Sequence, residues 1–317
     1  MASTPADFPD PPPGKNGWPW LRPAASRETN GPLPRISIVT PSFNQAAFLE
    51  ETIRSVLLQE HPPFEYIVMD GGSRDGSADT IKKYARHLKH WASEPDGGQG
   101  DAIDRGMRQV TGDIMAYINS DDFYLPGAFA TVARAFADCP EVDWIVGASL
   151  LCDERGRAFG INSSPGYSKA LFFSGRYLGG HAAWNGKWIP QESVFWRRSL
   201  WERAGAKFLC ERLQHGDFEL WSRFWHYADL HVLPVPLAAY RCHPETYTAT
   251  RGNQALEPCT RIIESSGLGE FSPGEIRLRD LLCRMGARLL NRFGEPARCL
   301  EYDSQASRWR AITRHVM

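Results

Sequence analysis

Two adjacent carboxylates, Asp121 and Asp122, follow a short apolar run at residues 114–118. Such a run, bounded by polar turn residues, predicts a buried strand. Ligands in open α/β sheets bind at the carboxyl ends of these strands. Two acids placed there repel each other and lose solvation, so they need a compensating cation. Mg²⁺ or Mn²⁺ holding a diphosphate would supply it, because both ions suit carboxylate and phosphate oxygens. The simpler alternative is an acidic cap of a helix that begins near Pro126.

Two further polar loops, residues 40–44 and 70–76, each follow a predicted strand. A parallel sheet brings its strand ends to one edge, so we expect these loops to converge with the acidic pair. Asp70 can accept from a base N–H, and Asp75 from a base or a ribose. Gly71 allows close approach of a ligand, although Asp and Gly also make ordinary tight turns. No G-x-G-x-x-G follows the first strand, which argues against a nicotinamide cofactor.

Strand and helix patterns alternate through the first part of the chain. Strands are predicted at 36–40, 66–69, 90–92 and 114–118, and helices at 45–59, 76–88 and 102–110. This order predicts an α/β fold with a mostly parallel central sheet and right-handed crossovers. The signal is weaker downstream, with helices expected at 128–137, 199–204, 218–227 and 275–293, strands at 144–147 and 230–240, and mostly loop at 160–190.

The 317-residue chain has 42% apolar and 23% charged residues and a net charge of -1. This composition is ordinary for a globular protein and gives no bias toward nucleic acid. Seven scattered cysteines without a C-x-x-C pair argue against a disulfide framework or zinc site and for a reducing compartment. No apolar run approaches the about 20 residues of a membrane span, and no signal peptide is recognisable. We therefore expect a cytoplasmic protein.

We expect three regions. Residues 1–34 are rich in Pro and Gly and predict an extended or disordered tail, which Trp18 and Trp20 could dock onto the body. Residues 35–250 form the main domain, with a nucleotide-binding half at 35–125 and an acceptor half at 126–250. Residues 251–317 are expected to form a helical extension.

Taken together, four motifs in order resemble family-2 glycosyltransferases, which have the GT-A fold. They are Thr40-Pro41-Ser42-Phe43-Asn44, Asp70-Gly71-Gly72-Ser73 with Asp75-Gly76-Ser77, Ser93-Glu94-Pro95-Asp96 with Gly100-Asp101-Ala102-Ile103, and Asn119-Ser120-Asp121-Asp122. The similarity covers about residues 35–250. It implies an inverting transferase that uses a metal ion and a nucleotide-activated sugar, for which we expect a UDP-sugar, and a glycan or lipid-linked glycan acceptor. The physical reading agrees, since a metal stabilises charge on the leaving diphosphate oxygen.

The resemblance also implies roles for individual residues. The nucleotide would be held by Thr40, Pro41, Asn44, Asp70, Gly71 and Asp75, the ribose would lie near Asp121, and the metal would bind Asp122. Gln99 and Asp104 follow on the next helix within plausible reach of the donor, or else belong to a solvated helix face.

The acceptor half carries a second acidic segment, at residues 216–221. An inverting transfer needs a base for the acceptor hydroxyl. The family has a similar acidic segment before Leu-Trp, which implies Asp217 as the base and Glu219 as the second choice. The alternative is a helix cap with an acidic first turn.

Other family-like segments flank this acidic one. A Pro-Gln-x-Ser loop implies acceptor contacts at Gln191 and Glu192, and Trp188 beside it could stack on a sugar or belong to the core. An Arg-x-His segment implies that His243 completes the metal shell. Thr246 and its neighbours stand where the family usually includes Lys.

Alternatives remain. A nucleotidyltransferase of related fold usually has a basic Gly-rich loop after its first strand, unlike residues 40–44 here. A catalytically silent binding module is disfavoured by the joint presence of Asp122 and Asp217. An Arg row beside the apolar stripe of residues 275–293 predicts peripheral contact with the inner face of a membrane, or a helix packed on the domain.

Overall fold

The computed structural model describes residues 8–21, 31–59, 63–177, 188–208, 216–246, 257–266 and 294–316. The first half alternates strands and helices: β1 (Ile36–Ser42), α1 (Ala46–Leu57), β2 (Phe64–Asp70), α2 (Ser77–Tyr84) with the 3-10 turn η1 (Ala85–His87), β3 (His90–Ser93), α3 (Gln99–Met107) and β4 (Ile114–Tyr117). This order confirms the predicted alternation, which apolar strand runs and helical spacing had indicated.

The second half is less regular. Its elements are β5 (Phe123–Tyr124), α4 (Ala128–Asp138), β6 (Trp144–Cys152), β7 (Ala158–Asn162), α5 (Lys169–Phe173), η3 (Gln191–Ser193), β8 (Val194–Arg197), α6 (Arg198–Arg203), α7 (Gly216–Phe224), β9 (Leu230–Arg241), α9 (Glu257–Ser266), β10 (Glu295–Asp303) and β11 (Arg308–Val316). The helix predicted at 275–293 lies outside the described residues.

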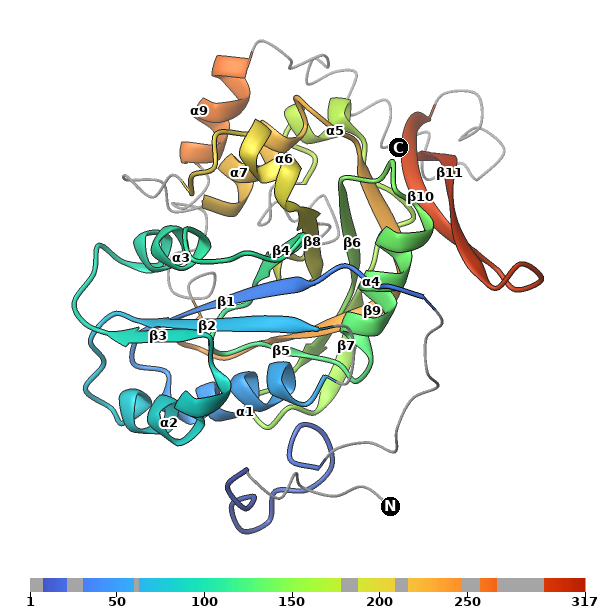
Figure 1. Cartoon of the computed structure of the whole chain (residues 1–317). Coiled ribbons are helices and arrows are strands. Elements are labelled where there is room, and N and C mark those ends of the chain that lie inside the picture. The colour runs from blue at the N-terminus through green and yellow to red at the C-terminus, as the bar shows by residue number, and fades with distance from the viewer. Residues whose placement is uncertain are drawn as a thin grey trace.

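One mixed, mostly parallel sheet runs through the molecule. Its strand order is β11-β10-β9-β6-β8-β4-β1-β2-β3, with β5 paired to β9 and β7 to β6. Helices α1 and α2 lie on one side of β1, β2 and β3, and α3 lies on the other, so this part of the sheet is covered on both faces (Figure 1). The expected α/β architecture is therefore confirmed.

Register explains how the polar loops meet. β1 pairs in parallel with β2, which sets Ser42 opposite Asp70, and with β4, which sets Val39 opposite Tyr117. The loops that follow these strands therefore leave the same edge of the sheet, as predicted. Gln191 in η3 reaches this edge too, because its Nε2 donates to the Tyr117 carbonyl oxygen at 2.7 Å.

The C-terminal segment differs from the expected helical extension. Only α9 is helical among its described residues, and β10 and β11 form an antiparallel hairpin at one edge of the central sheet (Figure 1). β10 pairs with β9 through Arg298 and Cys299. Ala297 and Cys299 of β10 are buried and Arg298 between them is exposed, but Leu300 is buried next to Cys299, so the alternation that would indicate a strand is broken in the sequence.

The core formed by the second half of the chain is rich in aromatic residues. The rings of Trp144, Trp196 and Trp221 are almost fully buried, and Trp221 lies 5.7 Å from Trp144 and 5.8 Å from Trp196 between ring centroids. These tryptophans therefore serve packing rather than sugar recognition. Among the described helices, none combines the length and the apolar character needed to cross a membrane.

Candidate active site

The loops after β1 and β2 are fastened to each other by side-chain caps. Asp75 Oδ2 accepts from the backbone N–H of Ala46 at 2.8 Å and so caps the start of α1. Asn44, with a positive φ of 53°, accepts from the Arg74 N–H and donates its own N–H to Ser73 Oγ. Asn44 and Asp75 are both exposed at the surface of the predicted nucleotide site. Both oxygens of Asp75 already accept hydrogen bonds, Oδ2 from Ala46 and Oδ1 from Ser77, but unlike a buried carboxylate Asp75 still faces solvent.

Other residues predicted to hold the nucleotide are already engaged inside the protein. Asp70 is 2% exposed and accepts from the Ser73 hydroxyl at 2.5 Å and the Ser93 hydroxyl at 2.6 Å. Thr40 is buried and accepts from Tyr66 Oη. Pro41 is buried beside it. These side chains shape the loops from below, whereas the sequence predicted direct contact.

Gly71 lies where a side chain would crowd a neighbouring loop. A Cβ atom there would lie 3.1 Å from the carboxylate oxygens of Asp96, which belongs to the loop after β3. The absence of a side chain lets the loops after β2 and β3 pack together. This agrees with the predicted close approach, although the neighbour in the structure is protein.

The acidic turn after β4 places its two carboxylates in different surroundings. Asp121 keeps part of its side chain exposed, and its Oδ2 lies 3.1 Å from Nε2 of His243. Asp122 is 1% exposed, and its Oδ1 accepts from the backbone N–H of Arg241 at 2.9 Å. Its Oδ2 is buried and has no hydrogen-bond partner. Burial raises the pKa of Asp122 well above its usual range, and the charges of Asp121 and Glu192 raise it further.

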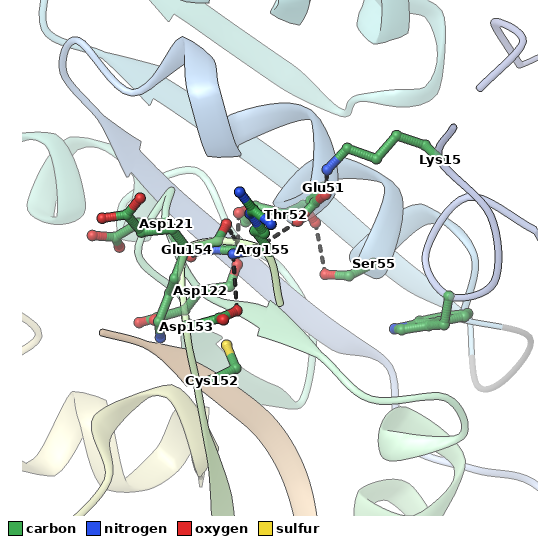
Figure 2. A network of polar contacts seen from close by, with 12 residues as sticks. Lys15, Glu51, Thr52, Ser55, Asp121, Asp122, Cys152, Asp153, Glu154 and Arg155 are labelled. Carbon is green, nitrogen blue, oxygen red and sulfur yellow. Dashed lines mark hydrogen bonds and ion pairs between the residues drawn. The ribbon is translucent and has the colours of Figure 1, made fainter. Parts of the chain in front are cut away.

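Arg241 is the main cation beneath this turn. Its guanidinium is buried, donates to the carbonyl oxygen of Asp121 at 2.8 Å and pairs with Glu51 on α1 at 2.6 Å. From the same helix, the hydroxyl of Thr52 donates to the carbonyl oxygens of Ser120 and Asp122. Figure 2 shows Glu51 and Thr52 of α1 beside Asp121 and Asp122 of the acidic turn. Glu51 and Thr52 were not singled out in the sequence, since nothing there distinguishes them from other polar helix residues.

The loop predicted to face the acceptor is buried. Gln191 and Glu192 are 7% and 2% exposed, so neither side chain lies at the surface where an acceptor would bind. One side-chain oxygen of each is buried without a partner. Burial raises the pKa of Glu192 to about 7, opposed by a hydrogen bond with Ser149 and reinforced by the charges of Asp217 and Asp121. Glu192 thus lies close enough to Asp217 and Asp121 for their charges to affect its protonation.

Glu192 gives a prediction about pH. Its pKa is raised in the folded protein, so the stability due to its proton is complete below about pH 4.5 and is lost as pH rises through about 7. Glu192→Gln removes this dependence. Without divalent cations, the unfolding free energy of the variant minus that of the wild type should increase by about 2–3 kcal/mol from pH 5 to pH 8.

Urea unfolding at pH 5, 6, 7 and 8 measures the effect. Glu202→Gln, which changes an exposed carboxylate on α6, is the matched control and should run parallel to the wild type. Equal pH slopes for Glu192→Gln and the wild type would show that Glu192 is charged at all these pH values.

The two carboxylates of α7 differ in whether they already have a cation. Glu219 is 7% exposed and forms a bidentate pair with Arg223, at 2.8 Å to Nε and 2.8 Å to Nη2. Asp217, half-buried in the first turn, accepts only from the Phe218 N–H, and no described cation pairs with it. Glu219 therefore ties one helical turn together, whereas Asp217 is the carboxylate of α7 without a cation partner among the described residues.

The two residues of α3 that were predicted to lie near the donor, Gln99 and Asp104, also differ in exposure. Gln99 is exposed, and its Nε2 donates to Asn119 Oδ1 at 2.7 Å, which joins α3 to the acidic turn. Asp104 is 5% exposed and accepts from the Phe208 N–H and from Arg108. Since both oxygens of Asp104 are occupied, its position fits an anchor for the segment before α7 and not a ligand of the donor.

Trp188 remains a candidate acceptor contact. Its ring is half-buried and packs edge-on against Tyr240 at 6.3 Å between centroids. Its carbonyl oxygen accepts from the Tyr167 hydroxyl at 3.0 Å, which fixes the backbone. A partly exposed flat ring on a fixed backbone suits contact with a sugar face.

Comparison with known proteins supports this arrangement. A family model described as "Glycosyl transferase family 2" matches residues 37–194, the stretch that includes β1 to the start of β8. All the loops described above that follow β1, β2, β3 and β4 lie inside the match. Asp217 and His243 lie beyond it.

Several curated relatives are glycosyltransferases by name. An uncharacterised glycosyltransferase of Mycobacterium tuberculosis is 30% identical over 178 residues, which cover 55% of this chain and 62% of that protein. One from Rickettsia typhi is 24% identical over 226 residues, 71% of this chain and 69% of that protein. The putative teichuronic acid biosynthesis glycosyltransferase TuaG of Bacillus subtilis is 33% identical over 94 residues, 28% of this chain and 36% of TuaG. The match thus spans less than two thirds of the Mycobacterium relative's length.

Among solved structures, S. aureus TarS 1-349 in complex with UDP-GlcNAc has a similar fold. The TM-score is 0.57 at 17% sequence identity, and the match covers 76% of this chain and 68% of that one. At this identity the likeness concerns the fold.

Proposed function

Because the chain belongs to glycosyl transferase family 2, we propose that it transfers a sugar from a nucleoside diphosphate donor to a glycan or lipid-linked glycan, with inversion at the anomeric carbon. The observation that carries this is the meeting of the polar loops after β1 and β2 with the acidic turn after β4 at one edge of the sheet. A glycosyl donor needs both features, one for its nucleoside and one for its diphosphate.

The residues fit a divalent cation at the acidic turn. Asp122 Oδ2 is an orphaned buried oxygen, and the pKa of Asp122 is raised by burial and by neighbouring negative charge, which a bound cation would offset. Asp121 and His243, 3.1 Å apart, would hold the ion, with Asp122 beneath them. The sequence instead predicted the metal on Asp122 and the ribose near Asp121. The oxygen and nitrogen donors suit Mn²⁺ better than Mg²⁺. Bound there, the ion would stabilise negative charge on the leaving diphosphate.

Side chains of the protein would orient the donor, accept the proton and contact the acceptor. Asn44, Asp75 and Gln99 would orient the donor from the rim of the site. The acceptor hydroxyl oxygen attacks the anomeric carbon while the bond from that carbon to the diphosphate oxygen breaks. Asp217 takes the hydroxyl proton, and a single displacement of this kind inverts the anomeric carbon. Trp188 would face the acceptor.

A donor panel tests the proposal. The wild type is incubated with Mn²⁺ and each of several nucleotide sugars, UDP-sugars first, and released nucleoside diphosphate is measured. Release that depends on Mn²⁺ and is absent in Asp217→Asn supports the transferase. Pyrophosphate release from a nucleoside triphosphate and a sugar phosphate would instead identify a nucleotidyltransferase. Donor binding by calorimetry with no turnover across glycan acceptors would identify a silent binding module.

A further inference from the structure

Residues 8–21, here called the strap, pack on helix α1. Arg54 of α1 is fully buried and donates to the carbonyl oxygens of Pro9, Pro19 and Trp20 at 2.9–3.2 Å. The ring of Trp20 is 4% exposed, and Arg54 lies 5.0 Å from its centroid. Three strap carbonyls around one buried cation fix the backbone of the strap on α1.

Two strap side chains continue toward the acidic turn. Lys15 Nζ lies 2.5 Å from Oε1 of Glu51. Trp18 Nε1 donates to the carbonyl oxygen of Tyr124 at 2.7 Å, two residues beyond Asp122. The strap therefore contacts both the helix that supports the turn and the chain that leaves it.

Glu51 connects the strap to the carboxylates. Its Oε1 pairs with Lys15, and its Oε2 pairs with Arg241 Nη2 at 2.6 Å. Arg241 in turn donates its Nε–H to the Asp121 carbonyl oxygen and its backbone N–H to Asp122 Oδ1. Two ion pairs and two hydrogen bonds thus connect Lys15 to the backbone carbonyl of Asp121 and the carboxylate of Asp122, and Figure 2 shows the strap end of this path.

We propose that the strap is a positioning element for cation and diphosphate binding, acting through Lys15, Trp18 and Glu51 on the acidic turn. This inference rests on the proposed function. The strap lies outside the matched family region, which begins at residue 37. Lys15 pairs with Oε1 of Glu51, and Arg241 pairs with Oε2. Loss of the Lys15 pair would free the Glu51 side chain and so loosen Arg241. Trp18 limits movement of the turn at its other end.

The test compares binding with stability in the full chain. Lys15→Met removes the charge, Lys15→Arg keeps it, and Trp18→Phe keeps a ring but removes the N–H donor. Lys82→Met, which breaks the exposed pair with Asp79 on α2, is the matched control. Titration calorimetry measures Mn²⁺ affinity in the presence of UDP, and thermal unfolding measures stability.

We expect the Lys15→Met and Trp18→Phe double variant to bind Mn²⁺ about three- to tenfold more weakly, with Lys15→Arg and Lys82→Met near the wild type. Unchanged Mn²⁺ affinity in the double variant would overturn the inference, even if its melting temperature falls, because the strap would then be only structural. Failure of the wild type itself to bind Mn²⁺ and UDP would overturn the proposed function instead.

Discussion

Asp217→Asn should lower kcat by about 10²–10⁴-fold and leave the affinity for the donor unchanged. Asparagine has the same shape and can still accept the Phe218 N–H that Asp217 accepts, so α7 should begin as before. An amide cannot take the proton of an attacking hydroxyl. Initial rates with saturating donor measure kcat, and calorimetry with UDP measures the binding that should not change.

Glu219→Gln is the matched control for this change. It removes one charge from the same helical turn and weakens the bidentate pair with Arg223. Breaking a largely buried pair should cost about 3 kcal/mol of unfolding free energy, with kcat within about tenfold of the wild type for the folded protein. A folded Glu219→Gln with negligible kcat, beside an active Asp217→Asn, would make Glu219 the base.

Asp121→Asn should abolish tight Mn²⁺ binding and reduce turnover by at least about 10²-fold, since an amide is a poor ligand for a hard cation. Asp121 is the partly exposed carboxylate, and its Oδ2 lies 3.1 Å from Nε2 of the buried His243 ring. Mn²⁺ binding can be followed by electron paramagnetic resonance without any substrate, so this readout does not depend on finding the acceptor. Circular dichroism would show whether the fold is kept.

Asp122→Asn separates the two aspartates. Its Oδ1 position still accepts the Arg241 N–H, and the change removes a buried charge whose pKa is raised by burial. We therefore expect Asp122→Asn to keep more Mn²⁺ affinity than Asp121→Asn. The reverse order would restore the assignment made from the sequence, with Asp122 as the metal ligand.

Sequence patterns predicted the half of the fold that alternates regularly. β1, β2 and β4 are short apolar runs with polar residues at both ends, and the position of the loops that follow them depends only on parallel pairing. β11 is exposed along most of both faces, and β10 has two adjacent buried residues, Cys299 and Leu300, so neither strand alternates regularly between apolar and polar residues. The helical assignment of residues 295–316 failed for that reason.

Within the site, sequence could identify carboxylates but not their partners. Asp104 and Asp217 are both aspartates, so the sequence does not distinguish them. In the structure, Arg108 and the Phe208 N–H bind Asp104, whereas no described cation pairs with Asp217. Likewise, the role of Glu51 depends on Arg241, which lies 190 residues away along the chain. Contacts over such separations depend on the tertiary fold and leave no local pattern.

The hairpin of β10 and β11 also affects how this protein behaves at high concentration. Among the strands that the structure describes, β11 ends the sheet, so its outer backbone groups could pair with a strand of another molecule. Arg308, Arg310 and Arg314 are exposed along this strand. A second copy aligned against it would bring like charges together, which disfavours pairing. The arginines of β11 should therefore protect the open edge from aggregation.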